Sequence, residues 1–149
     1  MIDRAQIGRT WAPWEVEIEK GRLRLLAKAM GETRPIYTDD AAARAAGYRG
    51  IVAPLTMPYC LLADSPGGQQ YLADVGIPTA RMLHAEVHVE HHDLICAGDR
   101  IRVDRRLTDI VVKKGGALEF VTFESTFRHA DGGGLVATVK SLMAVKNPT

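Results

Sequence analysis

Apolar positions in the first half of the chain recur mostly at helical spacing. Residues 15–19 alternate Glu with Val and Ile, which predicts a short half-buried strand. Apolar residues at helical spacing then run from 23 to 30, and Gly31 follows as a C-terminal cap. After a turn that contains a proline, Asp39 can cap a small Ala-rich helix that ends at Gly47.

The next helix is expected to lie in the core. Residues 53–58 open it, with Thr56 as the N-cap and Pro58 in the first turn, where its missing N–H would be unpaired anyway. Residues 59–63 are apolar nearly all round, which predicts burial. The Ser-Pro-Gly-Gly run at 65–68 ends the helix.

From about residue 80 the period changes to two, which predicts strands. Residues 83–90 alternate apolar and polar side chains, and the strand that begins at 101 loses phase near Arg105–Arg106, where we expect a bulge. Turns at 97–99, 115–116 and 131–134 separate these strands from two more, at 121–127 and 136–145. We therefore expect an α+β fold in which one antiparallel sheet covers its apolar face with the helix after Thr56. Without a repeat or a linker, residues 1–149 read as one domain.

Composition and charge narrow the classes of partner. The chain has 149 residues, of which 46% are hydrophobic and 25% charged, as in an ordinary globular domain. A net charge of +1 gives no electrostatic reason to expect nucleic acid or a membrane surface as partner. No apolar run approaches the roughly 18 residues that span a bilayer. The polar first ten residues do not resemble a signal peptide, and Cys60 and Cys96 are not spaced as a metal or redox pair, so we expect a cytoplasmic protein.

Three stretches together resemble one branch of the hotdog superfamily. They are Met30–Tyr37 followed by Asp39–Asp40, then Gly47–Thr56, and finally Leu83–Glu86 with the later Ala97–Asp99. On these stretches the chain is similar to the MaoC-like dehydratases, specifically to the N-terminal or fatty-acid-synthase-like dehydratase domain. The resemblance implies a hotdog fold, in which an antiparallel sheet wraps around a central buried helix. It also implies an acyl thioester held at a dimer interface.

The first stretch contains the positions of the catalytic dyad in that family. Active members carry Gly-Asp-x-x-Pro-x-His, in which the Asp and the His activate water for addition to an acyl thioester. Here Glu32 stands at the Asp position and Tyr37 at the His position. Tyrosine has an unperturbed pKa of about 10 and is a poor general base near neutral pH. In paired members one hotdog carries the dyad while the other shapes the acyl pocket, and this chain resembles the second kind.

The start of the predicted buried helix is the candidate substrate-binding segment. The free N–H groups at a helix N-terminus suit a thioester carbonyl that gains negative charge during the reaction. The backbone at this place has that role in the resembled family, which implies Ala53–Pro54–Leu55 as the corresponding stretch. The candidate substrate-binding residues are Pro54, Leu55 and Thr56. Pro54 has no N–H, so Leu55 is the expected donor. A plain capped core helix remains the alternative.

A histidine-rich strand offers a third candidate site. The alternating polar residues are His84, Glu86, His88, Glu90 and His92, which period-two spacing places on one face. Zinc and iron sites use such residues, but ligands two apart on a strand are about 6.5 Å from one another, so a compact site needs a neighbouring strand. The other strands offer only His129 and scattered acids, and we favour a solvent-facing surface, without metal or redox cofactor. His84 is kept as a catalytic candidate because it matches the family's Leu-His-x-Glu stretch.

Two remaining features are interpreted as structural. Arg105–Arg106 and Lys113–Lys114 could meet the phosphates of coenzyme A or of a phosphopantetheine arm, but charged pairs near a hairpin are more often solvated surface. We favour solvated surface for both pairs. Cys60, inside the apolar helix, is expected to be an inert buried thiol.

The leading hypothesis is a hydratase or dehydratase-type domain for an enoyl or 3-hydroxyacyl thioester of coenzyme A or acyl carrier protein. The resemblance implies reversible syn addition of water, in a homodimer or in a heterodimer with a dyad-bearing subunit. A non-catalytic acyl-thioester binding protein and a metal-dependent cupin-like protein are alternatives. A hotdog thioesterase is another, although Asp64, at the far end of the helix, is poorly placed to activate water.

Overall fold

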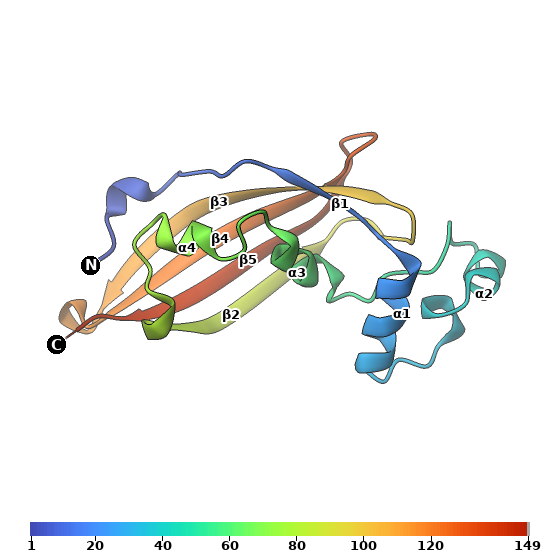
Figure 1. The fold of residues 1–149 in the computed structure, drawn as a ribbon, viewed down its shortest axis with the longest axis horizontal. Coiled ribbons are helices and arrows are strands. Elements are labelled where there is room, and N and C mark those ends of the chain that lie inside the picture. The colour runs from blue at the N-terminus through green and yellow to red at the C-terminus, as the bar shows by residue number, and fades with distance from the viewer. Residues whose placement is uncertain (149) are drawn as a thin grey trace.

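The computed structural model describes residues 1–148 and shows five antiparallel strands in one sheet (Figure 1). The strands are β1 (Trp14–Glu17), β2 (Met82–His91), β3 (Arg100–Lys113), β4 (Leu118–His129) and β5 (Leu135–Lys146). Their order across the sheet is β1-β3-β4-β5-β2, and every neighbouring pair is antiparallel. The short strand β1 and the strand β2 therefore form the two edges.

The helices are short and lie mainly in the first half of the chain. They are α1 (Lys20–Ala29), α2 (Asp40–Ala45), α3 (Met57–Cys60) and α4 (Gln70–Ala73), with 3-10 turns at Arg4–Gln6, Pro35–Tyr37, Leu61–Asp64, Thr79–Arg81 and Lys114–Gly116. Two predicted caps are confirmed: Gly31 follows α1 with a φ of +69°, and the Asp39 carboxylate accepts the Ala42 N–H at 2.8 Å. No helix within residues 1–148 is long and apolar enough to cross a membrane.

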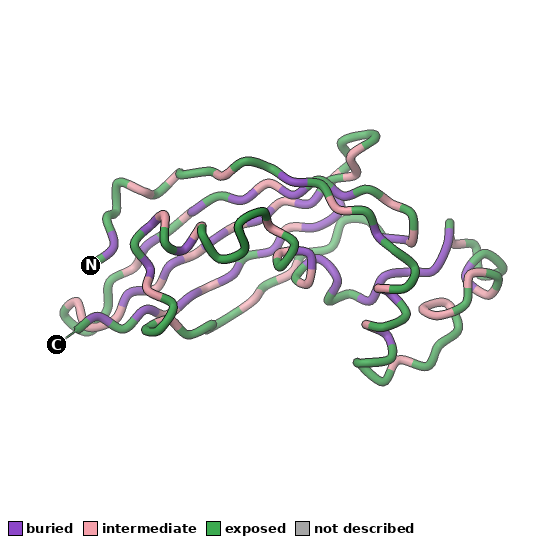
Figure 2. The backbone as a smooth tube through the Cα atoms, viewed as in Figure 1, coloured by how far each residue is buried: buried purple, intermediate pink, exposed green. Residues whose placement is uncertain are grey.

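One face of the sheet is buried, and we call it the inner face. Side chains of β3, β4 and β5 alternate between buried and accessible along each strand, as the period-two pattern predicted (Figure 2). A core cluster joins inner-face residues such as Val103, Phe127 and Val139 to Met57 and Leu61 of the central helical segment. The predicted hotdog arrangement, an antiparallel sheet around a central helix, is therefore confirmed.

The central helical segment is shorter and less buried than predicted. α3 has a single turn, continued by the 3-10 turn Leu61–Asp64. Met57 and Leu61, four residues apart, share the face that meets the sheet and are fully buried, whereas Tyr59 on the opposite side is 39% exposed. Cys60 is only half-buried, so its predicted burial is wrong. The segment begins after Thr56 as predicted, but the Thr56 hydroxyl donates to the Met30 sulfur at 3.3 Å instead of capping the helix.

A β-bulge in β2 overturns the predicted one-face ladder of histidines and glutamates. The pairing of β2 with β5 skips Ala85, so that His84 lies opposite Met143 and Glu86 lies opposite Leu142. One extra residue in a strand turns every side chain that follows it to the opposite face of the sheet. His84 therefore lies on the inner face and Glu86 on the outer face. In the part of the chain that the structure describes, no group of three or more His, Cys, Asp or Glu side chains could hold a metal ion.

The bulge in β3 falls later than predicted, between Leu107 and Asp109. Up to Leu107 the strand keeps its phase, so that Arg105 lies on the inner face with Val103. Arg105 is only 4% exposed, and the prediction that this residue belongs to the solvated surface is wrong. Its neighbour Arg106 is exposed on the outer face, as expected.

Candidate functional site

The side chains at the two dyad positions form a closed polar cluster. Both lie in the loop that follows α1, where Arg34 stands between them. The guanidinium of Arg34 donates to both carboxylate oxygens of Glu32, at 2.7 Å in the shortest contact, and to the Tyr37 hydroxyl at 3.2 Å. It also stacks over the Tyr37 ring at 4.8 Å from the centroid. The structure therefore brings Glu32 and Tyr37 together, with a cation between them.

This cluster fixes the protonation state of Glu32. The hydrogen bonds from the Arg34 side chain, followed by that from the Arg34 backbone N–H, lower the pKa of Glu32 from 4.5 to about 2. A carboxylate that holds no proton at neutral pH and is already paired is a weak proton acceptor. The Tyr37 hydroxyl oxygen accepts a hydrogen bond from the same guanidinium. The lowered pKa therefore makes Glu32 a weak general base near neutral pH.

The loop with this cluster lies against the candidate substrate-binding segment. The Val52 N–H donates to the Ile36 carbonyl at 3.0 Å, and Thr56 contacts Met30. The dyad positions and residues 54–56 are thus neighbours in space as well as in the resemblance. His84, by contrast, lies farther along the inner face, where its ring is 5.5 Å from the ring of Tyr59.

Backbone donors are scarce at residues 53–56. The Ala53 N–H donates to the Ile95 carbonyl at 2.8 Å, and Pro54 has no N–H. The N–H groups of Leu55 and Thr56 donate to no acceptor within residues 1–148, and Leu55 is 61% exposed. These are loop residues, and the single turn of α3 behind them supplies little dipole. The donor predicted at Leu55 is therefore available, although the long helix expected behind it is absent.

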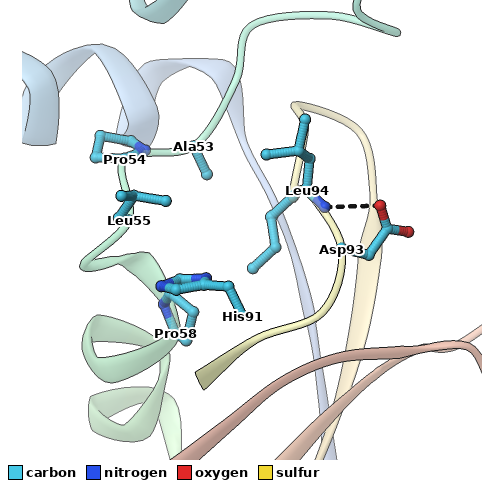
Figure 3. A pocket seen from close by; sticks show the side chains of 8 residues that line it. Ala53, Pro54, Leu55, Pro58, His91, Asp93 and Leu94 are labelled. Carbon is cyan, nitrogen blue, oxygen red and sulfur yellow. Dashed lines mark hydrogen bonds between the residues drawn. The ribbon is translucent and has the colours of Figure 1, made fainter. Parts of the chain in front are cut away.

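A small recess opens beside this segment (Figure 3). Its volume is about 10 Å³, close to the space of one water molecule. Its walls are Ala53, Pro54, Leu55, Pro58, His91, Asp93, Leu94 and Ile95. Sequence reasoning missed His91, which lies opposite Ala137 on the inner face because the bulge resets the phase of β2. The signal that could have found it is its period-two spacing from the half-buried Val87 and Val89.

A larger cavity lies between the central helical segment and the sheet. It has a volume of about 400 Å³, within the range of small-molecule pockets. Its walls come from three parts of the chain: Tyr59, Cys60, Leu62 and Ala63 of the helical segment, Gly68, Gln69 and Tyr71 at α4, and Ser141 and Met143 of β5. His84 lies beside it, since it contacts Tyr59 and pairs with Met143. No wall residue is acidic or basic, and the hydroxyl and amide groups among the walls come from Tyr59, Gln69, Tyr71 and Ser141.

Comparisons with known proteins agree with this architecture. A family model described as the FAS1-like dehydratase domain region matches residues 5–139. A UPF0336 protein of Clavibacter michiganensis is 34% identical over 89% of this chain and 86% of its own length. A UPF0336 protein of Saccharopolyspora erythraea is 29% identical over 97% of this chain and 92% of its own.

Two solved structures share the fold at a TM-score of 0.79. One is the HadBC (3R-hydroxyacyl-ACP dehydratase) complex of Mycobacterium tuberculosis, with 20% identity over 93% of this chain and 96% of that chain. The other is a MaoC-like dehydratase with 26% identity, which covers 96% of this chain but only 43% of that longer chain. A family model that matches nine-tenths of the sequence, together with the hotdog architecture, places this chain in the FAS1-like dehydratase domain family.

Proposed function

We propose that this chain binds the acyl part of an enoyl or 3-hydroxyacyl thioester of coenzyme A or acyl carrier protein. In this proposal it is the pocket-forming subunit of a hotdog dimer whose partner carries the Asp–His dyad. The observation that carries the proposal is the Glu32–Arg34–Tyr37 cluster, in which an ion pair occupies the dyad positions. The loop with this cluster contacts the segment that holds the open Leu55 N–H, through Val52 and Thr56. The cavity of about 400 Å³ offers room for the acyl chain.

The reaction assigned to the dimer is the reversible addition of water to an α,β double bond. A base removes a proton from water, the hydroxyl oxygen bonds to the β-carbon, and an acid protonates the α-carbon. Negative charge collects on the thioester oxygen between these steps, and the Leu55 N–H is the donor proposed to stabilise it, with Pro54 and Thr56 shaping the backbone. The proton transfers belong to the partner's dyad, and no metal or redox step is needed.

The proposed partner is a second hotdog. Two structural neighbours from Mycobacterium tuberculosis are complexes of two different chains, HadBC and ChsH1–ChsH2. A homodimer is the simpler alternative when this chain is made alone. We propose that residues 1–149 act as one hotdog unit, in the cytoplasm and in the metabolism of fatty acids.

The test is crotonyl-CoA hydration by the purified chain, alone and mixed with a candidate subunit that carries Gly-Asp-x-x-Pro-x-His. The expected result is weak or absent activity alone and activity in the mixture, reduced by a Leu55→Pro substitution that removes the proposed donor. Robust hydration by the chain alone, unchanged by Tyr37→Phe, would contradict the proposal. His84 would then be the next residue to substitute.

A non-catalytic thioester-binding protein remains the second candidate, because the paired Glu32 carries no free proton-transfer function. A thioesterase is less well supported, since Asp64 is ion-paired with Arg22. Free coenzyme A released from an acyl-CoA would identify a thioesterase. Tight binding without turnover in any mixture would identify a binding protein.

A further inference from the structure

A polar diagonal crosses the inner face of the sheet. Arg105 of β3 lies opposite Ser125 of β4, and Ser141 of β5 is the diagonal neighbour of Ser125, since it lies opposite Phe123. All three polar side chains are buried. The diagonal separates the two apolar core clusters, of which one contains Val103, Phe127 and Val139 and the other Leu107, Phe123 and Met143. Polar residues thus interrupt the core between its two apolar clusters.

The cation on this diagonal has no counter-charge. The guanidinium of Arg105 stacks 3.9 Å from the centroid of Tyr71 and 5.0 Å from that of Trp14. Its hydrogen bonds, to Ser65 Oγ at 3.3 Å and the Leu62 carbonyl at 3.4 Å, are both long. It pairs with no carboxylate within residues 1–148. Desolvation lowers the pKa of Arg105, and stacking on aromatic rings offsets only part of the cost of burying a charge.

The other end of the diagonal opens into the cavity of about 400 Å³. Ser141 lines that cavity, and its hydroxyl forms no hydrogen bond in the described part of the chain. Tyr71 also lines the cavity, and its ring stacks on the Arg105 guanidinium, which is not itself one of the cavity walls. Burial raises the pKa of Tyr71, so its hydroxyl keeps the proton that it can donate. The cavity thus offers the hydroxyls of Ser141 and Tyr71 as donors, and one of these two residues contacts the buried cation.

We propose that the acyl group bound in this cavity carries a carboxylate in its distal part. The Ser141 and Tyr71 hydroxyls donate to it, and Arg105 supplies the compensating charge from behind the Tyr71 ring as a positioning residue. This inference rests on the proposed function and names the substrate class of the same site: the mono-thioester of a dicarboxylic acid. A bound carboxylate provides the counter-charge that the protein itself does not offer to Arg105.

The test compares three coenzyme A thioesters that differ only at the distal end: suberyl-CoA, its neutral methyl ester, and octanoyl-CoA. Calorimetry on the full chain is expected to show suberyl-CoA binding about tenfold or more tightly than the methyl ester, the size of one charged hydrogen bond. Arg105→Met should bring this ratio to about one, Arg105→Lys should keep part of it, and Ser141→Ala should lower it.

Arg106→Met is the matched control, because this neighbouring arginine is exposed on the outer face. It should leave the ratio unchanged. Replacing a buried charge by an apolar side chain of similar length is often tolerated, and a melting curve verifies folding. If Arg105→Met does not fold, the inference is tested on Ser141→Ala. The preference of this variant for suberyl-CoA over the methyl ester should be lower than that of the parent protein.

A purely structural role of Arg105 would weaken all three ligands alike and leave the ratio near that of the parent protein, which would overturn the inference. Equal binding of the three thioesters by the parent protein would also overturn it, while the proposed function would stand. Failure to bind any of the three would overturn both.

Discussion

Arg34 decides the chemistry available at the dyad positions. Its guanidinium reaches the Glu32 carboxylate and the Tyr37 hydroxyl from within the same loop. From the sequence, only the exchange of the family's Asp and His for Glu32 and Tyr37 argued against general acid–base catalysis at this place. The geometry adds the Arg34 cation, which is paired with the Glu32 carboxylate.

The first prediction concerns the ionisation of Glu32. In Arg34→Met the Glu32 pKa should rise from about 2 toward the ordinary 4.5, because the hydrogen bonds that favour the carboxylate are lost. A pKa lowered in the folded protein contributes stability that is fully present above about pH 4.5 and lost as the pH falls toward 2. NMR titration of the side-chain carboxyl carbon measures the shift. A parent Glu32 that titrates near 4.5 would contradict the ion pair.

The second prediction concerns restored catalysis. Glu32→Asp with Tyr37→His recreates the dyad residues, but Arg34 remains to pair with the new Asp. We expect a larger gain in crotonyl-CoA hydration when Arg34→Met is added, within the 10²–10⁴-fold range of general acid–base catalysis. Arg34→Met alone is the control and should stay inactive. Equal rates for the double and triple variants would show that Arg34 does not block the site.

Two residues at this scale were misread or missed in the sequence. Arg105 was interpreted with Arg106 as a surface pair, although its period-two spacing from Val103 and Leu107 places it among inner-face residues. His91 was missed because the strand was phased from His84. Arg105 was misread because arginine side chains are usually exposed. His91 was missed because a single alternation phase was applied to the whole of β2.

At the scale of elements, the sequence correctly predicted the strands and helix caps that depend on alternating burial or on local backbone conformation. The long strands β3 to β5 alternate because one face is buried, and the caps at Gly31 and Asp39 follow from backbone conformation and hydrogen bonding. The bulge at Ala85 has no composition signal, since it depends on pairing with a distant strand. The length of α3 could not be predicted either, because an apolar run does not show which side of a helix the rest of the fold leaves open.

The third prediction concerns α2, a helix of six residues held by one side-chain cap. Asp39 accepts the Ala42 N–H at 2.8 Å. Asp39→Ala should lower the free energy of unfolding by about 1 kcal/mol, the typical value of an N-cap. Chemical denaturation followed by circular dichroism measures it, and Asp39→Asn, which keeps an acceptor, is the control. A loss of the same size in Asp39→Asn would show that charge, and not capping, is responsible.

At the scale of the whole molecule, the two edges of the sheet differ. The N-terminal segment lies along the β3 side, where Thr10 bridges to Arg106, and the buried Glu119 ties this segment to the C-terminal one through the Ile2 N–H and the Asn147 amide. The two termini lie at the same end of the sheet (Figure 1). The β2 edge, by contrast, pairs with no further strand within residues 1–148.

The last prediction is that this open edge forms a dimer interface. Unpaired backbone groups and exposed apolar side chains on an edge strand favour association. Leu83 of β2 is 74% exposed, and Tyr59 of the central segment is exposed beside the inner-face His84. Light scattering at micromolar concentration should show a dimer, and Leu83→Lys should shift it toward monomer. Val112→Lys, at an exposed position near the far end of β3, is the matched control and should leave the dimer intact. A parent chain that is monomeric at this concentration would contradict this prediction.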